Sequence, residues 1–317
     1  MSLYRYVHLA LVLGALWLVG CEMAPVVRRS EVVQAAPPEV TAPFAAPLTA
    51  GPTITPTASA TATASPPTTW KVITVAPPAS PTPTPCRETR GTVERISVNS
   101  PVLNYPLEAH LYLPPCYAAT RQRYPVVYLI HGLNFTDDQW VRLGAPTTAD
   151  GLIARGEIAP AIIVMPRDRR DERLGRALVD DLVPYIDSHY RTLTDRQYRA
   201  LGGLSRGGAW AIHIGLEHPE LFGRLGAHSP AVFLGDEANL LQWMRYLPSD
   251  QQPQIYIDIG DKDSLEHCAL WLHQSLTWFR IPHTYILQPG AHSERYWAQH
   301  MADYLRFYAA GWRRAGG

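Results

Sequence analysis

Two continuous apolar runs place the strongest limit on how this chain can fold. "YPVVYLIHG" (124–132) and "PAIIVMP" (160–166) are rich in Val and Ile and carry almost no polar residue at their centres. A strand that faces solvent on one side alternates polar and apolar residues, whereas a strand covered on both faces does not. The two runs therefore predict central strands of a sheet that helices cover on both sides.

The chain around these runs alternates strands with helices. "VERISVNS" and "EAHLYLPP" alternate polar and apolar residues at period two, which predicts an antiparallel pair at the start of the domain. Further strands are predicted in "YRALGG", "RLGAHSP", "PQIYIDIGD" and "HTYILQPG". The alternation predicts an α/β fold with a mainly parallel central sheet and helices on both faces.

Helices are predicted at 176–190, at 206–217 and from near Ser264 and Ser293. In the first, apolar residues recur at helical spacing in "RALVDDLVPYIDSHY". Pro184 falls inside that pattern, so we expect it to bend the helix or to stand in its first turn.

The first 85 residues differ in composition from the rest of the 317-residue chain. An apolar run after Arg5 predicts a signal peptide over 1–21, and "LVGC" at its end resembles the bacterial lipobox, whose cysteine, here Cys21, is acylated. The alternative is an ordinary secreted protein in which Cys21 is incidental. Residues 22–85 are dominated by Pro, Thr and Ala, which predicts a disordered linker, and the folded domain is predicted at 86–317.

The charge balance limits which partners are expected, and the cysteines indicate whether disulfides can form. The net charge is zero and no basic run with interleaved aromatic residues occurs, so nucleic acid is not an expected partner, whereas a membrane, reached through an acylated Cys21, is. An exported chain can form disulfides, and Cys86 and Cys116 are candidates for one, although spacing alone does not exclude unpaired thiols. Cys268 is expected on the buried face of a helix.

The most informative motif is Gly203-Leu204-Ser205-Arg206-Gly207, which matches G-x-S-x-G between a predicted strand and a predicted helix. Glycines are needed there because a nucleophile on a sharp strand-to-helix turn leaves no room for neighbouring Cβ atoms. The alternative is a serine in an ordinary glycine-rich turn. The setting favours Ser205 as a nucleophile.

A serine nucleophile needs a base, and the base needs an acid to hold it. In this fold class the acid and then the base follow the serine along the chain. "IYIDIGDKDSL" offers Asp258, Asp261 and Asp263 as acids, of which Asp258 is expected inside the strand and Asp263 could instead cap the next helix. "LQPGAHSERYW" places His292 after a strand, so His292 is the predicted base.

Two backbone amides must also stabilise the oxyanion of the reaction. Arg206 supplies one as the residue after the nucleophile, and "HGLN" (131–134) offers Leu133 as the other, with a simple turn as the alternative. No metal and no organic cofactor are predicted, because His and acidic residues do not occur at ligand spacing such as H-E-x-x-H.

The segments "YPVVYLIHG", "GGLSRGG", "HPELFG", "GDKDSL" and "GAHSERYW" together resemble the esterase family of the α/β-hydrolase superfamily. This family includes feruloyl and acetylxylan esterases, S-formylglutathione hydrolase, enterochelin esterase and mycolyltransferases of the antigen 85 type. The resemblance covers residues 86–312 and implies an α/β-hydrolase fold. In relatives of the feruloyl esterase kind the acid lies in G-x-x-D-S-L and the base in G-x-H, which implies Asp263 and His292 here.

The residue after the serine is often Met, Leu or Gln in that family, and here it is Arg206. We expect its side chain in a surface ion pair, the more common fate of such an arginine, although it could meet an anionic substrate group. The charged loop "RDRRDER" (167–173) could rim the site, but the expected alternative is a solvated loop.

The sequence predicts an extracytoplasmic serine esterase that acts on a small-molecule or carbohydrate-linked ester, with Ser205, His292 and Asp263 as triad. Two alternatives remain open. An acyltransferase would use the same triad, and a binding module on a hydrolase fold would not use it at all.

Overall fold

The computed structural model describes residues 86–312. The predicted signal peptide (1–21) with its acylated Cys21 and the predicted linker (22–85) lie outside these residues. The predicted domain (86–317) is described except for its last five positions.

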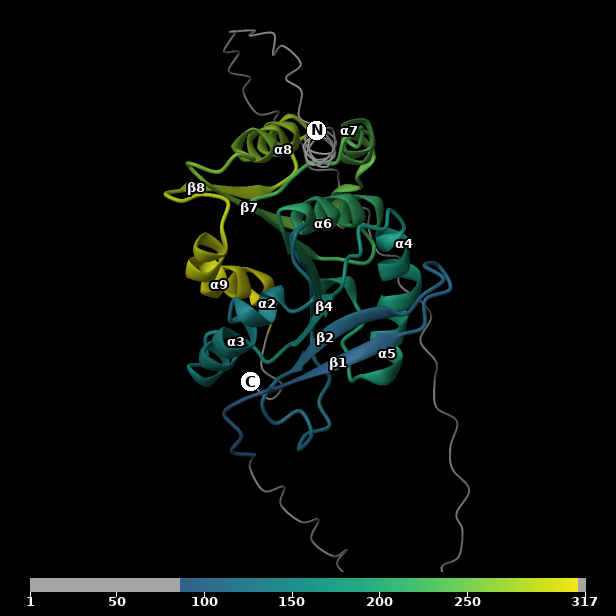
Figure 1. Cartoon of the computed structure of the whole chain (residues 1–317), viewed down its shortest axis with the longest axis vertical. Helices are drawn as coiled ribbons and strands as arrows, with labels where there is room; N and C mark the ends of the chain where they lie inside the picture. Colours follow the sequence, from purple (N-terminus) through teal and green to yellow (C-terminus); the bar gives the residue numbers. More distant parts are fainter. Residues whose placement is uncertain (1–85, 313–317) are drawn as a thin grey trace, which may run out of the picture. The chain divides into compact units, whose positions relative to one another are not determined.

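An eight-stranded sheet forms the centre of the domain, in the order β1-β2-β4-β3-β5-β6-β7-β8 (Figure 1). The strand β2 is antiparallel to both of its neighbours, and every other pair is parallel. The fold class predicted from the sequence is therefore confirmed, including the antiparallel entry pair. The strands are β1 (Thr92–Val98), β2 (Leu107–Leu113), β3 (Val126–Ile130), β4 (Ile162–Pro166), β5 (Arg199–Leu204), β6 (Arg224–His228), β7 (Gln254–Gly260) and β8 (His283–Gln288).

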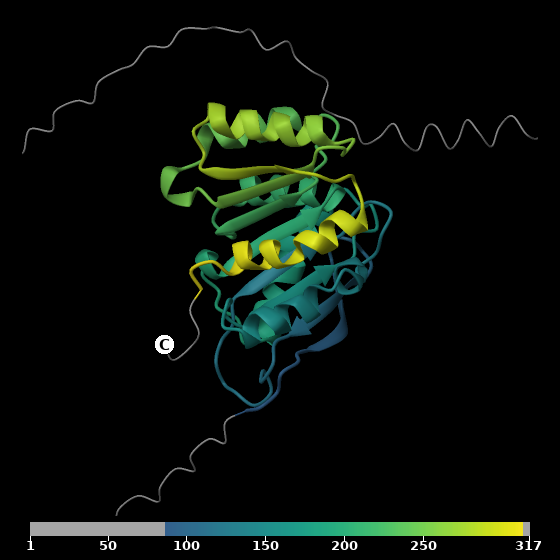
Figure 2. The same cartoon turned by 90° about the vertical axis from the view of Figure 1, so that its left-hand side faces the viewer.

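Helices cover both faces of this sheet, and Figure 2 shows α9 lying across one of them. The α-helices are α2 (Gln139–Arg142), α3 (Ala145–Ala154), α4 (Leu174–Ala177), α5 (Val183–His189), α6 (Arg206–Glu217), α7 (Glu237–Tyr246), α8 (Glu266–Trp278) and α9 (Glu294–Ala309). The remaining helical turns are η2 (Leu178–Leu182), η3 (Arg196–Tyr198) and η4 (Ser249–Gln251).

The central strand β3 contributes to two hydrophobic cores, one on each face. Val126, Tyr128 and Ile130 join the core under α5, α6 and α8. Val127 and Leu129 join the core under α3 and α9. All five side chains are at most 2% exposed, as expected for a run without polar alternation.

The predicted helix over 176–190 is not one regular helix. The segment begins as α4, widens into the π-helical turn η2 and continues as α5, where Pro184 is the second residue. Proline has no N–H to donate and its ring collides with the carbonyl four residues earlier, so a widened turn before Pro184 relieves the clash. The helices α2, α3 and α7 were not predicted individually.

Cys86 and Cys116 form a disulfide in the structure, with Cα atoms 5.8 Å apart and a sequence separation of 30. The bond joins the start of the domain to the turn after β2. Cys268 is fully buried in α8.

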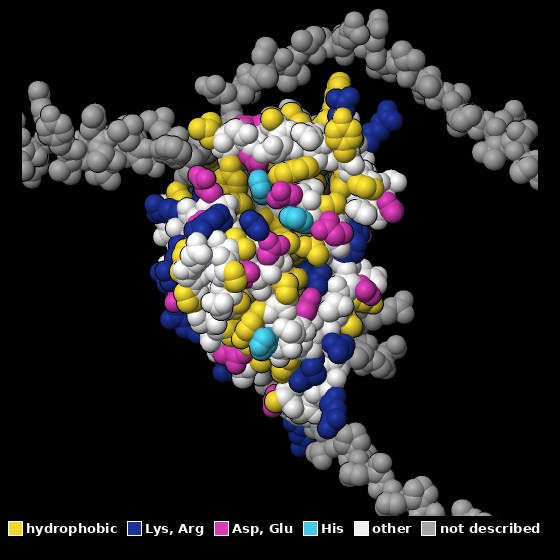
Figure 3. Space-filling view, turned by 90° about the vertical axis from the view of Figure 1, so that its right-hand side faces the viewer, with side chains coloured by type: hydrophobic (Ala, Val, Ile, Leu, Met, Phe, Trp, Pro, Cys, Tyr) yellow, Lys and Arg dark blue, Asp and Glu magenta, His cyan; other side chains and the backbone are white. Residues whose placement is uncertain are grey.

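None of the helices within residues 86–312 is both long and apolar enough to span a lipid bilayer. On the face shown in Figure 3, basic and acidic side chains are interspersed with apolar ones.

Replacing both Cys86 and Cys116 by Ser should lower the free energy of unfolding by about 3 to 4 kcal/mol. The cause is the added entropy of an unfolded chain that is no longer closed over 30 residues. Urea denaturation with and without a reductant measures the effect. The reductant should lower the midpoint of the wild type and leave the variant unchanged, and equal midpoints for the wild type in both conditions would contradict the bond.

Candidate active site

Ser205 occupies a sharp turn between β5 and α6. Its backbone has φ 57° and ψ −115°, a conformation that non-glycine residues rarely adopt and that costs about 1 to 3 kcal/mol. Hydrogen bonds from neighbouring strand ends hold the turn, since Ser205 N–H donates to the carbonyl of His228 at 2.8 Å and Ala231 N–H donates to the Ser205 carbonyl at 3.2 Å. The partly buried serine is thereby presented at the carboxyl edge of the sheet.

The glycines of the motif allow two close backbone approaches. A Cβ at Gly207 would lie 2.2 Å from the carbonyl oxygen of Ile130, and a Cβ at Gly203 would lie 2.2 Å from that of Gly207. Both distances are far below van der Waals contact, and both neighbours are backbone atoms that cannot swing aside. The start of α6 can pack against the ends of β3 and β5 only because these positions lack side chains.

Asp263 and His292 are brought together by the loops that follow β7 and β8. His292 Nδ1 lies 2.9 Å from each carboxylate oxygen of Asp263. The side chain of Asp263 is fully buried, whereas that of His292 is 28% exposed. Asp263 also accepts the N–H of Leu265 at 2.9 Å just before α8, so it contacts both the helix start and the imidazole.

The other two aspartates of this segment have different partners. Asp261 accepts the N–H of Gly290 at 2.9 Å and braces the loop before His292. Asp258 lies within β7 and is fully buried in the core.

Ser205 and His292 lie at the same edge of the sheet but are not hydrogen-bonded within the described residues. Trp297 connects them indirectly. Its ring contacts that of His292 with centroids 5.0 Å apart, and its Nε1 donates to Ser229 Oγ at 3.0 Å. Ser229 directly follows His228, whose carbonyl accepts the Ser205 amide.

The two residues that carry the predicted oxyanion amides line the same cavity. Leu133 N–H has no hydrogen-bond partner within residues 86–312, and Arg206 N–H is in the first turn of α6, where amides lack intrahelical acceptors. Both residues line a cavity of about 620 Å³. The remaining lining residues are Arg170, Glu172, Trp210, His213, Phe233, Leu234, Gly235, Asp236 and Asn239.

Two expectations about this region were wrong. Arg206 does not form a surface ion pair, because its side chain is only 13% exposed and its Nε donates to the buried Asp168 at 2.6 Å. The loop over 167–173 is not simply solvated, because Asp168 is buried and Arg170 and Glu172 line the cavity.

A buried network that sequence reasoning missed lies beneath the serine turn. His228 Nδ1 contacts Asp258 at 2.6 Å and its Nε2 contacts the hydroxyl of Tyr308 at 2.7 Å. Tyr296 and Tyr304 both donate to the second oxygen of Asp258. Burial, reinforced by Asp258, raises the pKa of both tyrosines far above the usual range, so they remain neutral donors. Because His228 and Asp258 are fully buried, they cannot meet a substrate.

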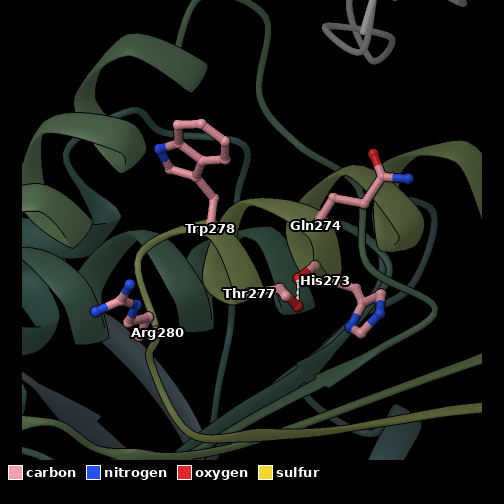
Figure 4. Close-up of a pocket in the computed structure, with 5 residues that line it drawn as sticks. All are labelled: His273, Gln274, Thr277, Trp278 and Arg280. Carbon is pink, nitrogen blue, oxygen red and sulfur yellow. Dashed lines mark hydrogen bonds between the residues drawn. The ribbon is translucent and has the colours of Figure 1, made fainter. Parts of the chain in front are cut away.

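A hollow beside α8 and a cluster of Cys and Glu side chains are both distinct from the serine site. The hollow in Figure 4, of about 520 Å³, is lined by His273, Gln274, Thr277, Trp278 and Arg280, which lie in the second half of α8 and just after it, whereas Asp263 precedes the first residue of α8. The ligand atoms of Cys86, Glu88 and Cys116 lie within 4.8 Å of one another, but both sulfurs belong to the disulfide.

Comparisons with known proteins agree with this architecture. A family model described as "Putative esterase" matches residues 100–308. An endo-1,4-beta-xylanase/feruloyl esterase of Xylanibacter ruminicola is 31% identical over 193 residues, which is 56% of this chain and 26% of the relative. The chain thus spans about a quarter of the length of that relative.

Solved structures show the same fold at lower identity. A ferulic acid esterase superimposes with a TM-score of 0.63 at 24% identity, covering 69% of this chain and 98% of the other. An S-formylglutathione hydrolase of Staphylococcus aureus gives a TM-score of 0.59 at 16% identity, covering 69% and 99%.

Gly207→Ala should lower the free energy of unfolding by about 2 kcal/mol or more, because the new Cβ would overlap the backbone at Ile130. Gly151→Ala in α3 is the matched control, since its Cβ would meet only the flexible end of Arg155 at 3.2 Å. Its effect should stay within about 1 kcal/mol, with stabilisation favoured by the helix propensity of Ala. Thermal or urea denaturation measures both variants, and equal stabilities would contradict the packing argument.

Proposed function

Because the chain belongs to the esterase family of α/β-hydrolases, whose members act on carboxylic esters, we propose that it is an exported serine esterase. Ser205 is the nucleophile, His292 the general base and Asp263 the acid that orients His292. The amides of Leu133 and Arg206 form the oxyanion hole. No metal or organic cofactor takes part in this proposal.

The observation that carries the proposal is the contact between His292 and Asp263. A carboxylate with both oxygens 2.9 Å from Nδ1 favours the tautomer that is protonated at Nδ1. The tautomer leaves Nε2 unprotonated and able to accept a proton. Ser205 is displayed at the same edge of the sheet, on a turn whose strain and glycine packing suit a nucleophile.

The chemistry then proceeds in two halves. Ser205 Oγ attacks the ester carbonyl carbon while its proton passes to His292 Nε2. The carbonyl oxygen becomes negative and accepts hydrogen bonds from the N–H groups of Leu133 and Arg206. Collapse of this intermediate expels the alcohol, which takes the proton from His292, and leaves an acyl-enzyme. Water attacks the acyl-enzyme with His292 again as base, and the acid and Ser205 are released.

The cavity beside Leu133 and Arg206 supports an ester with an apolar or aromatic portion. Trp210 and Phe233 lie in its wall with ring centroids 4.8 Å apart. The relatives include proteins named as a feruloyl esterase and a ferulic acid esterase. We therefore propose feruloyl or acetyl esters of carbohydrates as the first substrates to test.

A pair of neighbouring aspartates tests the mechanism. Asp263→Asn should reduce kcat for p-nitrophenyl acetate by about 10³- to 10⁴-fold, because an amide favours the wrong tautomer of His292. Asp261→Asn is the matched control in the same loop and should change kcat only slightly, because the asparagine Oδ1 can still accept the N–H of Gly290.

Ser205→Ala should abolish turnover in the same assay, with folding checked by circular dichroism. Equal rates for the wild type and Ser205→Ala would exclude the serine mechanism. Equal losses at Asp261 and Asp263 would remove the assignment of the acid.

The proposed location rests on the N-terminal sequence alone. We propose that residues 1–21 direct export, that Cys21 is acylated and anchors the protein to the bacterial membrane surface, and that residues 22–85 are a linker that holds the domain away from it.

Cys21→Ala should prevent incorporation of an alkyne-labelled fatty acid when the full chain is made in a bacterial host. It should also move the protein out of the membrane fraction. Cys268→Ala is the matched control, because Cys268 is buried in α8 and should not affect labelling. Equal labelling of the wild type and Cys21→Ala would contradict acylation at this residue.

A further inference from the structure

Asp168 is a buried carboxylate that the proposed reaction does not use. It follows β4, and its side chain is only 1% exposed. One carboxylate oxygen accepts from Arg206 Nε at 2.6 Å and from Trp210 Nε1 at 3.1 Å. The other oxygen accepts the N–H of Arg170 at 2.6 Å.

The backbone of Asp168 contacts a different segment, the one that follows β3. Its N–H donates to His131 Nε2 at 2.9 Å, and His131 Nδ1 contacts the Gly132 carbonyl at 2.7 Å. Burial lowers the pKa of His131, which keeps the imidazole neutral, so Nε2 can accept while Nδ1–H donates. Gly132 N–H in turn donates to the buried Gln139 Oε1 at 2.8 Å.

The strand order explains why one residue reaches both segments. β3 lies between β4 and β5 in the sheet. A residue just after β4 can therefore contact the end of β3 with its backbone, while its side chain reaches across β3 to the start of α6, which follows β5. His131 and Gly132 directly precede Leu133, and Arg206 is the first residue of α6. Asp168 is therefore bonded to the two segments that carry the proposed oxyanion amides.

The Arg206 side chain is held by more than the ion pair. Its guanidinium carbon lies 5.1 Å from the centre of the Phe233 ring and 5.7 Å from that of Trp210. A charge-assisted hydrogen bond at 2.6 Å inside an aromatic enclosure leaves little freedom to the residue that bears it. Asp168 thus ties the first residue of α6 to the loop that follows β4.

We propose that Asp168 is a positioning residue that sets the spacing and direction of the Leu133 and Arg206 amides. The inference rests on the proposed function, because it assigns a purpose to the oxyanion hole of that mechanism. Amide donors must lie within about 0.5 Å of their productive positions, and a displacement of about 1 Å costs on the order of 100-fold in rate. Asp168 would therefore affect the transition state more than the binding of substrate.

The domain provides a matched control for a merely structural ion pair. Asp187 and Arg199 form a pair at 2.7 Å, with side chains 20% and 4% exposed. Arg199 begins β5, whereas Ser205 follows its other end. Asp187→Asn therefore breaks a comparable ion pair at the first residue of β5, at the opposite end of that strand from Ser205.

The test compares Asp168→Asn with Asp187→Asn in the full chain. For p-nitrophenyl acetate, Asp168→Asn should lower kcat about 10- to 100-fold while KM changes less than about twofold. Hydrogen–deuterium exchange should become faster at segments 131–134 and 205–208. Asp187→Asn should lower the melting temperature but leave kcat and exchange at these segments unchanged.

Two outcomes would overturn the inference: a kcat of Asp168→Asn equal to that of Asp187→Asn, or unchanged exchange at both segments. If Asp168→Asn does not fold, Arg206→Met replaces it, because it removes the guanidinium and leaves Asp168 bonded to Trp210 and Arg170. The same selective loss of kcat would support the inference, and a wild-type kcat would overturn it. An inactive wild type would instead defeat the proposed function, while the exchange comparison would still decide whether Asp168 holds the two segments.

Discussion

The close approach of α6 to the ends of β3 and β5 is the constraint on which the rest of the site depends. Gly207 and Gly203 permit backbone contacts that any side chain would prevent. Because α6 begins so near the sheet, Ser205 is forced into a positive φ and its hydroxyl is raised at the carboxyl edge. The same approach brings the Arg206 amide beside the end of β3, where Leu133 follows. The raised position of the nucleophile and the proximity of the two segments that carry the proposed amides thus follow from one close packing contact, and the proposed role of Asp168 is to fix these segments more finely.

The strained turn is supported from below by a polar network inside an otherwise apolar layer. His228 holds the Ser205 amide through its carbonyl, and its ring is fixed by Asp258 and Tyr308. The tyrosines of α9 complete the hydrogen bonds of Asp258, so no oxygen of this buried carboxylate is left without a donor. α9 also carries Trp297, which contacts His292. One helix therefore braces both the serine turn and the loop of the proposed base.

The sequence was sufficient for the fold because its strongest signals are local. The apolar runs at 124–132 and 160–166 predicted buried central strands, and β3 and β4 are buried on both faces. The family resemblance was confirmed by the match over residues 100–308. The interruption before Pro184 could not be located, because a π turn depends on how the surrounding helix packs. The Cys86–Cys116 bond is formed in the structure, whereas the triad stays a prediction, although Asp263 and His292 are in contact.

The position of Arg206 illustrates what a linear pattern cannot reveal. An arginine after the serine predicted a charge at the surface, yet the structure turns that charge inward to Asp168, a residue 38 positions earlier. Only the strand order, with β3 between β4 and β5, makes this contact possible. Because the guanidinium is already paired with a carboxylate, Arg206 has little net charge to offer an anionic substrate. The other charged residues that line the cavity, Arg170, Glu172 and Asp236, then contribute the rest of its electrostatic potential.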